Sequence, residues 1–466
     1  MDAAPRFRSA RVARHRQLIT GSAVLVVGAA IQAVTGSLFW LVAAQIDTKA
    51  DVGSATKLFT SVLFVTYLAG FGLPVALARY APNRDRDSDV VFTWSAIVTV
   101  ASSTVLGGAY VAAFEFTDIF KSSATEVLTD FHAVLGPLLF VVAVAGAALS
   151  MIVDVRCMTA RRWNLVLARI TIVGIIRIPL LFLMQDGEHR ALLLFLFAIG
   201  PVAASGIVGA LFVPQVAEGR HRFGPKPSTA REAVRYSFVN YVSTLAYQAP
   251  YFALPVIVLT SVDSDAYASF YIAWGVVGLA FYVPTAIGQA LLAEGGRDGA
   301  RVYSQVKLAM LLALGLMVAG AAASYVGKDL VTTFYGEQYD DAARVLPVMM
   351  AAGIPWAVSS LLLSEARVLH RHIATVAITL TLTAAIVIPA LHLVPLDGID
   401  GASRAWFIGN VVAAGVAVVF TLAGRIRAAD TGRDVPPVIA PVDPDGAAGP
   451  EQAAQPDPVG AHSHQG

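Results

Sequence analysis

The sequence is poor in charged residues and in cysteine, and each shortage excludes a class of protein. Only 14% of its 466 residues are charged, against about 25% in an average soluble protein. A single cysteine, Cys157, excludes a disulfide within the chain and a metal site built on cysteines. The sequence also lacks a glycine-rich phosphate-binding loop with its lysine, so we expect no ATP hydrolysis.

Apolar residues take the place of the missing charges. They make up 56% of the chain, and the mean hydropathy is +0.67, which indicates a polytopic membrane protein. Runs of about 20 apolar residues predict twelve membrane-spanning helices. The expected spans are residues 18–45, 55–78, 90–114, 131–153, 164–184, 191–214, 237–260, 266–293, 303–325, 345–363, 373–394 and 405–423.

Arginine and lysine are concentrated in every second loop, beginning with the N-terminal segment. Cytoplasmic loops carry such an excess of basic residues, so an even number of spans with both termini in the cytoplasm explains the alternation. The first apolar run is too long for the core of a signal peptide, and we interpret it as a retained helix. We expect a multi-pass protein of the bacterial cytoplasmic membrane.

The two halves of the chain match at a shift of 210 residues. Residues 71–76 then align with 281–286, and Ile178-Pro179 aligns with Ile388-Pro389. Because six spans separate the copies, both halves have the same orientation, which predicts a parallel repeat about an axis along the membrane normal.

The repeat and the composition divide the chain into five parts. We expect a basic cytoplasmic N-terminus (1–17), an N-lobe of helices 1–6 (18–214), a cytoplasmic linker (215–236), a C-lobe of helices 7–12 (237–427) and a tail (428–466). The tail is rich in proline, glycine and alanine and cannot bury enough apolar surface to order itself, so we expect it to be disordered.

Several short motifs resemble those of one known family. They are Asp51-Val52-Gly53 before the second span, Phe71-Gly72-Leu73-Pro74 continuing to Arg79-Tyr80 at its end, residues 335–342 before the tenth span and 398–402 before the twelfth. In this order, over about residues 15 to 427, the chain resembles the multidrug/oligosaccharidyl-lipid/polysaccharide (MOP) exporter superfamily, and within it the Wzx-type flippases. The resemblance implies an all-α fold with two six-helix bundles around a central cavity that opens to alternate sides.

The fifth span contains two arginines, Arg169 and Arg177. An arginine at the centre of a membrane helix costs about 2.5–3.5 kcal/mol on insertion scales, so each is expected to meet an aqueous cavity, a paired acid or an anionic ligand. Eight residues separate them, or about 12 Å along the helix, and both fall within one broad face.

A guanidinium group suits phosphate oxygens, so our hypothesis is that this face guides a lipid-linked pyrophosphate. The alternative for Arg169 is that its side chain reaches the cytoplasmic interface, for which Arg177 lies too deep. At the 210-residue shift the two positions hold Thr379 and Val387. The fold itself therefore does not require the two charges.

Polar and aromatic side chains at helical spacing are candidate sugar contacts, because amides and aromatic faces bind neutral sugars. They are Asn240, Tyr247, Gln248 and Tyr251 in the seventh span, Tyr271 and Trp274 in the eighth, and Gln32 in the first. Lys57, near the start of the second span, is a further cavity candidate. The alternative is hydrogen bonding and aromatic packing between helices of the bundle.

The residues show no catalytic constellation and no metal-like spacing of histidines, so we expect a non-enzyme without cofactor or metal. Our leading interpretation is a flippase that moves a polyprenyl-pyrophosphate-linked oligosaccharide across the membrane by alternating access, for cell-surface polysaccharide biosynthesis. Its expected partners are that lipid-linked oligosaccharide, membrane lipids and the polymerase and glycosyltransferases of the pathway. No nucleic-acid partner is expected.

Other functions remain open. A cation-coupled multidrug exporter of the same superfamily would rely on buried carboxylates, which spans 1, 7 and 8 lack, and Arg169 and Arg177 would repel cationic drugs. A lipid II flippase typically adds two helices where this chain has its tail. A membrane-embedded glycosyltransferase or polymerase would have a large outer loop, and a scaffold would have no use for the two arginines.

Overall fold

The computed structural model describes residues 27–74, 77, 86–116, 123–184, 187–216, 221, 223–224, 241, 245, 248–295, 302–369 and 371–431. Within these residues the regular structure is entirely helical, and ten helices are long and apolar enough to cross a membrane. The candidate sites Asn240 and Tyr247, the N-terminus and most of the expected linker lie outside the described residues.

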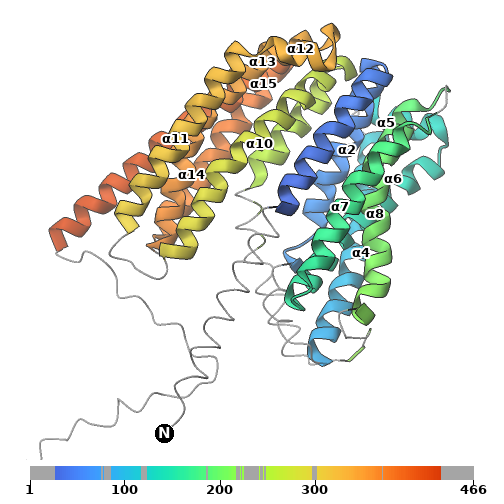
Figure 1. The fold of residues 1–466 in the computed structure, drawn as a ribbon, viewed down its shortest axis with the longest axis horizontal. Helices are drawn as coiled ribbons and strands as arrows, with labels where there is room; N and C mark the ends of the chain where they lie inside the picture. The colour runs from blue at the N-terminus through green and yellow to red at the C-terminus, as the bar shows by residue number, and fades with distance from the viewer. Residues whose placement is uncertain are drawn as a thin grey trace, which may run out of the picture.

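The helices follow the order of the expected spans (Figure 1). Their bounds are Val27–Ile46, α2 Lys49–Ala69, α4 Arg86–Phe116, α5 Ser123–Phe131, α6 Leu135–Thr159, α7 Trp163–Leu181, α8 Arg190–Val216, Gln248–Ser261, α10 Ser264–Gly295, α11 Val302–Val326, α12 Asp329–Tyr335, the 3-10 helix η3 Glu337–Tyr339, α13 Asp340–Ala351, α14 Gly353–Val368 and α15 His372–Thr431. α13 and α14 together form one candidate span, and Gln248–Ser261 is the described part of the seventh.

α15 contains two spans that fold back on each other. Gly398 interrupts it with a left-handed backbone conformation (φ 58°, ψ −133°). On either side the chain pairs antiparallel: a Cβ at Gly401 would lie 2.1 Å from the Leu393 carbonyl oxygen, and one at Gly409 would lie 2.2 Å from the Ile386 side chain. The eleventh and twelfth expected spans are therefore present as a hairpin of two helices that turns at Gly398.

One helix begins earlier than the apolar pattern predicts. The second span was expected from residue 55, but α2 starts at Lys49 because Thr48 caps it. The Thr48 hydroxyl accepts a hydrogen bond from the backbone N–H of Asp51 at 3.2 Å and donates one to the Asp51 carboxylate at 2.5 Å. A reciprocal cap of this kind compensates for the polar first turn, so hydropathy alone misses it.

The helices form two bundles that meet at α2 and α10 and spread apart from there (Figure 1). In the N-lobe, α2, α4, α6, α7 and α8 pack together, and in the C-lobe α10, α11, α13, α14 and α15 do. Ser54 Oγ and Ser264 Oγ lie 2.9 Å apart across the junction and are 210 residues apart in sequence. A residue meets its own repeat equivalent only at the axis that relates them, which confirms the parallel repeat.

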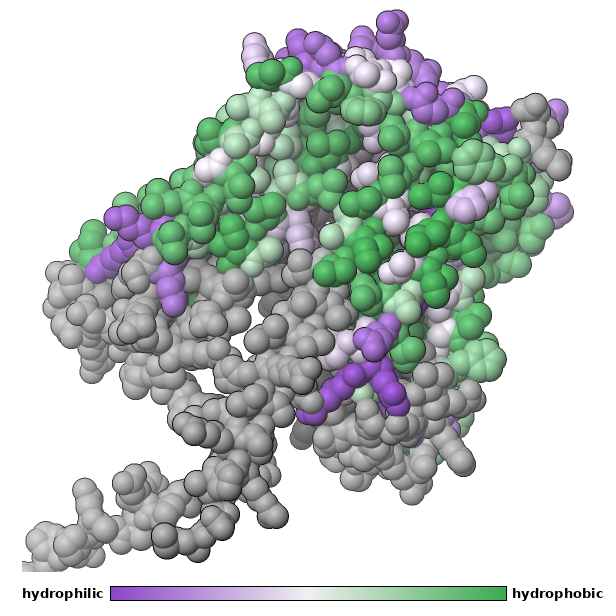
Figure 2. Space-filling view, viewed as in Figure 1, coloured by the Kyte–Doolittle hydropathy of each residue, from purple (hydrophilic) through white to green (hydrophobic). Residues whose placement is uncertain are grey.

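The surface has the polarity of a membrane protein. Figure 2 shows a broad hydrophobic belt with hydrophilic residues gathered toward its two ends. Many large apolar side chains of the membrane-length helices are exposed, among them Ile172, Leu311 and Val419, each more than 60% exposed. Contiguous apolar surface of this extent is compatible with a lipid environment and not with water.

The hairpin of α15 depends on glycine at Gly409. We expect Gly409→Ala to destabilise the protein by about 1–3 kcal/mol, because the added methyl group has no room against Ile386. Gly415→Ala on the same arm is the control, since a Cβ there meets nothing within 4 Å. Thermal unfolding of the detergent-solubilised protein measures both, and equal melting temperatures would contradict the expected hairpin packing.

Candidate functional site

Arg169 is held inside the N-lobe by an acid of the neighbouring helix. Its Nε donates a hydrogen bond to Asp154 Oδ1 at 2.7 Å, and its Nη2 donates to Asp154 Oδ2. Nη1 donates to Ser205 Oγ of α8 at 3.1 Å. A membrane arginine was expected to meet an aqueous cavity, a paired acid or an anionic ligand, and for Arg169 the structure shows the paired acid. All three guanidinium nitrogens of Arg169 donate hydrogen bonds within the protein.

Arg177 lies on the same helix, about 6 Å from its C-terminal end, and has no such partner. Its side chain is 7% exposed, and its Nε is buried without a hydrogen-bond partner. Among the described residues no carboxylate lies within salt-bridge distance of it. α7 packs against the first span, where a Cβ at Gly174 would lie 2.5 Å from Thr35 Oγ1.

Tyr271 itself is packed in an aromatic cluster that joins the lobes. Its ring lies 5.5 Å from that of Trp40 and 6.4 Å from that of Phe59, both edge to face, and Trp40 and Phe59 pack at 5.8 Å. Trp40 and Phe59 come from the N-lobe and Tyr271 from the C-lobe. The cluster therefore packs the first span and α2 of the N-lobe against α10 of the C-lobe.

Tyr251 and Trp274 belong to a second aromatic cluster, within the C-lobe. The Tyr251 ring lies 5.5 Å from both Trp356 and Trp406, and Trp274 lies 5.0 Å from Trp406. Trp356 and Trp406 are each 1% exposed, whereas Tyr251 and Trp274 are partly buried. Aromatic packing within the bundle therefore explains this pair, and any sugar contact would use only their remaining edges.

Gln248 and Gln32 are the other described candidates. Gln248 is partly buried at the start of the described seventh span, and Gln32 is exposed on the first. Neither makes a hydrogen bond that ties it to Arg177 or Tyr271. The sequence pattern placed them on helices correctly, but it could not tell which helix face each would occupy.

Lys57 lies in the contact between the lobes and not on an open cavity surface. It is 1% exposed, its Nζ donates to the Val262 carbonyl at 2.6 Å, and it lies 5.8 Å from the centre of the Tyr267 ring. The Tyr267 hydroxyl donates to Thr60 Oγ1 at 2.8 Å. We call these cross-lobe contacts of α2 with α10 and the turn before it the lobe seal. Its residues are Gly53, Ser54, Lys57 and Thr60 on one side and Val262, Ser264 and Tyr267 on the other.

Sequence reasoning missed Asp154 and Thr60. Asp154 follows directly on the fourth expected span, and Arg169 lies in the fifth. The two are at similar depth in the membrane, so the sequence could have indicated their ion pair. Thr60 carried no signal, since threonine is common in membrane helices.

The Arg169–Asp154 pair should matter more for stability than an exposed pair. We expect Asp154→Asn to cost roughly 3–5 kcal/mol, because it leaves the Arg169 charge largely buried without an acid. Asp397→Asn is the matched control: its partner Arg404 is 60% exposed, and such surface pairs contribute about 0–1 kcal/mol. Melting temperatures in one detergent compare them, and a similar loss in both variants would contradict the assigned pairing.

Comparison with known proteins rests on solved structures, since no protein-family model and no curated protein matches this sequence. An inward-facing multidrug resistance MATE family transporter of the MOP superfamily superposes with a TM-score of 0.65 at 18% identity, covering 86% of this chain and 95% of that one. The lipid II flippase MurJ, in an inward closed conformation, gives 0.67 at 11% identity, covering 85% and 87%.

A third match is a MOP superfamily transporter from Pyrococcus furiosus described as having a binding pocket of reversed polarity. It gives a TM-score of 0.55 at 16% identity and covers 89% of this chain and 96% of that one. At these identities the matches show the fold alone, and they confirm the all-α fold that the resemblance implied. The chain has the fold of the MOP superfamily transporters.

Proposed function

We propose that this chain is a flippase that moves a polyprenyl-pyrophosphate-linked oligosaccharide across the cytoplasmic membrane by alternating access. The observation that carries the proposal is Arg177, a cation 7% exposed and without a carboxylate within salt-bridge distance among the described residues. A buried charge without a counterion is strongly disfavoured in a membrane protein unless a ligand neutralises it. A pyrophosphate supplies that negative charge and matches the geometry of a guanidinium group.

The position of Arg177 supports a transport role. It lies on α7 of the N-lobe, which packs against the first span, and Trp40 of that span contacts Tyr271 of the C-lobe at 5.5 Å. Opening of the lobe seal would separate Trp40 from Tyr271 and expose Arg177 to the opposite side of the membrane. The pyrophosphate would thus meet the arginine from one side and leave it from the other, which is the requirement of alternating access.

The principal test replaces Arg177. In proteoliposomes supplied with a polyprenyl-pyrophosphate-linked oligosaccharide, we expect Arg177→Ala to insert normally but flip at least tenfold more slowly than the wild type. Arg177→Lys keeps the charge without the fork and should restore part of the rate. Ile175→Ala is the control, because that side chain is 56% exposed on the same helix. Wild-type flipping by Arg177→Ala would remove Arg177 from the mechanism.

The same vesicles separate the proposed function from its rival, a cation-coupled multidrug exporter. The fold is equally compatible with that rival, since MATE exporters share it. If the wild type moved cationic dyes and no lipid-linked oligosaccharide, the exporter would replace our proposal. The local chemistry favours the flippase, because Arg177 would repel a cation that reached it.

The proposed membrane orientation can be tested by cysteine labelling. Cys157, the single native cysteine, is 3% exposed and should stay unlabelled. In intact cells a membrane-impermeant maleimide should label Glu337→Cys, at the end expected to face outward, and should reach His372→Cys only after permeabilisation. The opposite pattern would invert the proposed topology, and with it the direction of transport.

A further inference from the structure

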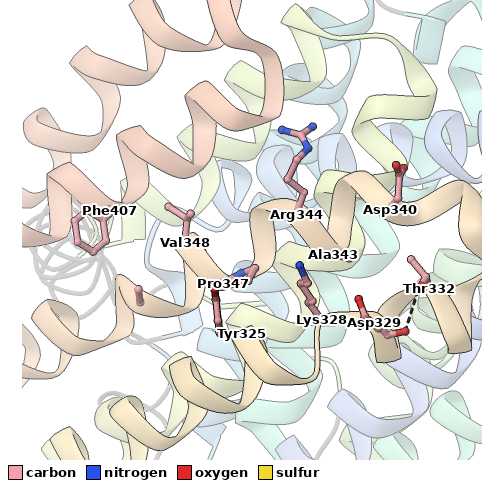
Figure 3. Close-up of a pocket in the computed structure, with 11 residues that line it drawn as sticks. Tyr325, Lys328, Asp329, Thr332, Asp340, Ala343, Arg344, Pro347, Val348 and Phe407 are labelled. Atoms are coloured by element: carbon pink, nitrogen blue, oxygen red, sulfur yellow. Dashed lines mark hydrogen bonds between the residues drawn. The ribbon is translucent and has the colours of Figure 1, made fainter.

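A groove with a volume of about 720 Å³ lies on the C-lobe, away from Arg177 and from the lobe seal. Its floor is one face of α13, formed by Asp340, Ala343, Arg344, Pro347, Val348 and Ala351. This spacing of three and four residues is that of a single helix face. The walls are the turn between α11 and α12 on one side and Phe407 of α15 on the other (Figure 3).

The groove is polar at one end and apolar at the other. Figure 3 shows Asp329, Thr332 and Asp340 at one end and Val348 and Phe407 at the other, with Lys328 and Arg344 between them. From Asp340 to Ala351 the floor descends by about 16 Å. Its polar end lies on the face of the membrane that the basic-loop pattern assigns to the outside.

The surroundings of the groove indicate the interface of a lipid leaflet. Tyr325 is 71% exposed beside it, and the neighbouring α12 exposes Leu330 (56%) and Phe334 (57%). Exposed aromatic residues at the end of a membrane helix are typical of the headgroup level. Below, the walls continue into exposed apolar faces that include Leu311 of α11 and Val411 of α15, so an acyl chain in the groove would extend along lipid-facing surface.

The charged side chains at the polar end of the groove are not all paired within the described part of the protein. Arg344 is paired with Asp341 at 2.7 Å and also with Asp400. Among the described residues, by contrast, Lys328 has no carboxylate within salt-bridge distance, and Asp329 and Asp340 have no cation. Asp340 Oδ1 accepts a hydrogen bond from the Asp341 backbone N–H at 2.8 Å, which leaves its charge without a cation. The Lys328 ammonium group and the Asp329 and Asp340 carboxylates complement a headgroup that carries one negative and one positive charge.

A backbone acceptor adds to this complementarity. Pro347 has no N–H group, so the Ala343 carbonyl four residues earlier lacks its helical donor. Ala343 lines the groove between the charged end and the apolar end. A primary ammonium group has three N–H donors and can use such a carbonyl together with a carboxylate.

We propose that this groove binds a zwitterionic phospholipid with a primary amine, of the phosphatidylethanolamine type, through its phosphate at Lys328, its ammonium at Asp329 and Asp340, and an acyl chain along Val348 and Phe407. A phosphatidylglycerol headgroup has no ammonium and would place its phosphate beside two carboxylates without a counterion. The groove therefore selects by headgroup charge. All of its lining residues belong to the C-lobe, so binding does not depend on whether the lobe seal is open.

The experiment is native mass spectrometry of the purified full-length protein with either phosphatidylethanolamine or phosphatidylglycerol added. We expect the wild type to retain at least fivefold more of the former. Val348→Trp, which fills the apolar end, should lower phosphatidylethanolamine retention at least fivefold, and so should the surface substitution Lys328→Ala. Asp329→Asn with Asp340→Asn should bring the two lipids to equal retention, because the ammonium loses its acceptor charges.

Arg404→Ala is the matched control, since it removes an exposed outer cation that does not line the groove. Equal retention of the two lipids by the wild type, or unchanged retention by both Val348→Trp and Lys328→Ala, would overturn the proposal. Displacement of the phospholipid by a lipid-linked oligosaccharide would also overturn it, because the groove would then be a substrate site. None of these readouts depends on flipping, so the result stands apart from the test of Arg177.

Discussion

The close approach of α2 and α10 at the repeat axis is the constraint on which the rest of the structure depends. A Cβ at Gly53 would lie 1.8 Å from the Ser264 carbonyl oxygen, so the two helices touch backbone to backbone there. Lipid chains are as apolar as the helices, and small residues and hydrogen bonds hold membrane helices together in place of the hydrophobic effect. The lobe seal has both. Gln45 with Phe334, Lys49 with Asp341 and Tyr241 with Leu68 add polar contacts between the lobes.

Much of the architecture could be predicted from the sequence because the bilayer imposes a length and an apolar composition on each span. The parallel repeat was also readable, since Phe71 and Phe281 begin matching segments. The start of α2 was not, because it depends on the Thr48 cap and not on hydropathy. The turn at Gly398 was expected as a loop of about ten residues, whereas the observed turn is tight because glycine adopts a positive φ.

The candidate site was less predictable, since a residue's role there depends on its neighbours in space. Arg169 and Arg177 have the same chemistry on one helix, yet among the described residues an acid lies within salt-bridge distance of Arg169 alone, namely Asp154 of α6. The spacing of residues along the chain cannot show which of the two arginines has an acidic neighbour in space. Tyr251 and Trp274 likewise resemble a sugar-binding stripe in sequence, but their rings pack with Trp356 and Trp406.

Comparison of the two halves shows that the charge of Arg177 has no equivalent in the C-lobe. At the position equivalent to Arg169 the C-lobe has Thr379, whose hydroxyl donates to the Thr375 carbonyl of its own helix at 2.8 Å. The equivalent of Arg177 is Val387, which needs no polar partner. In the proposed mechanism the pyrophosphate therefore stays with the N-lobe throughout the cycle. The C-lobe contributes the aromatic closure at Tyr271, so its movement decides from which side the bound anion is accessible.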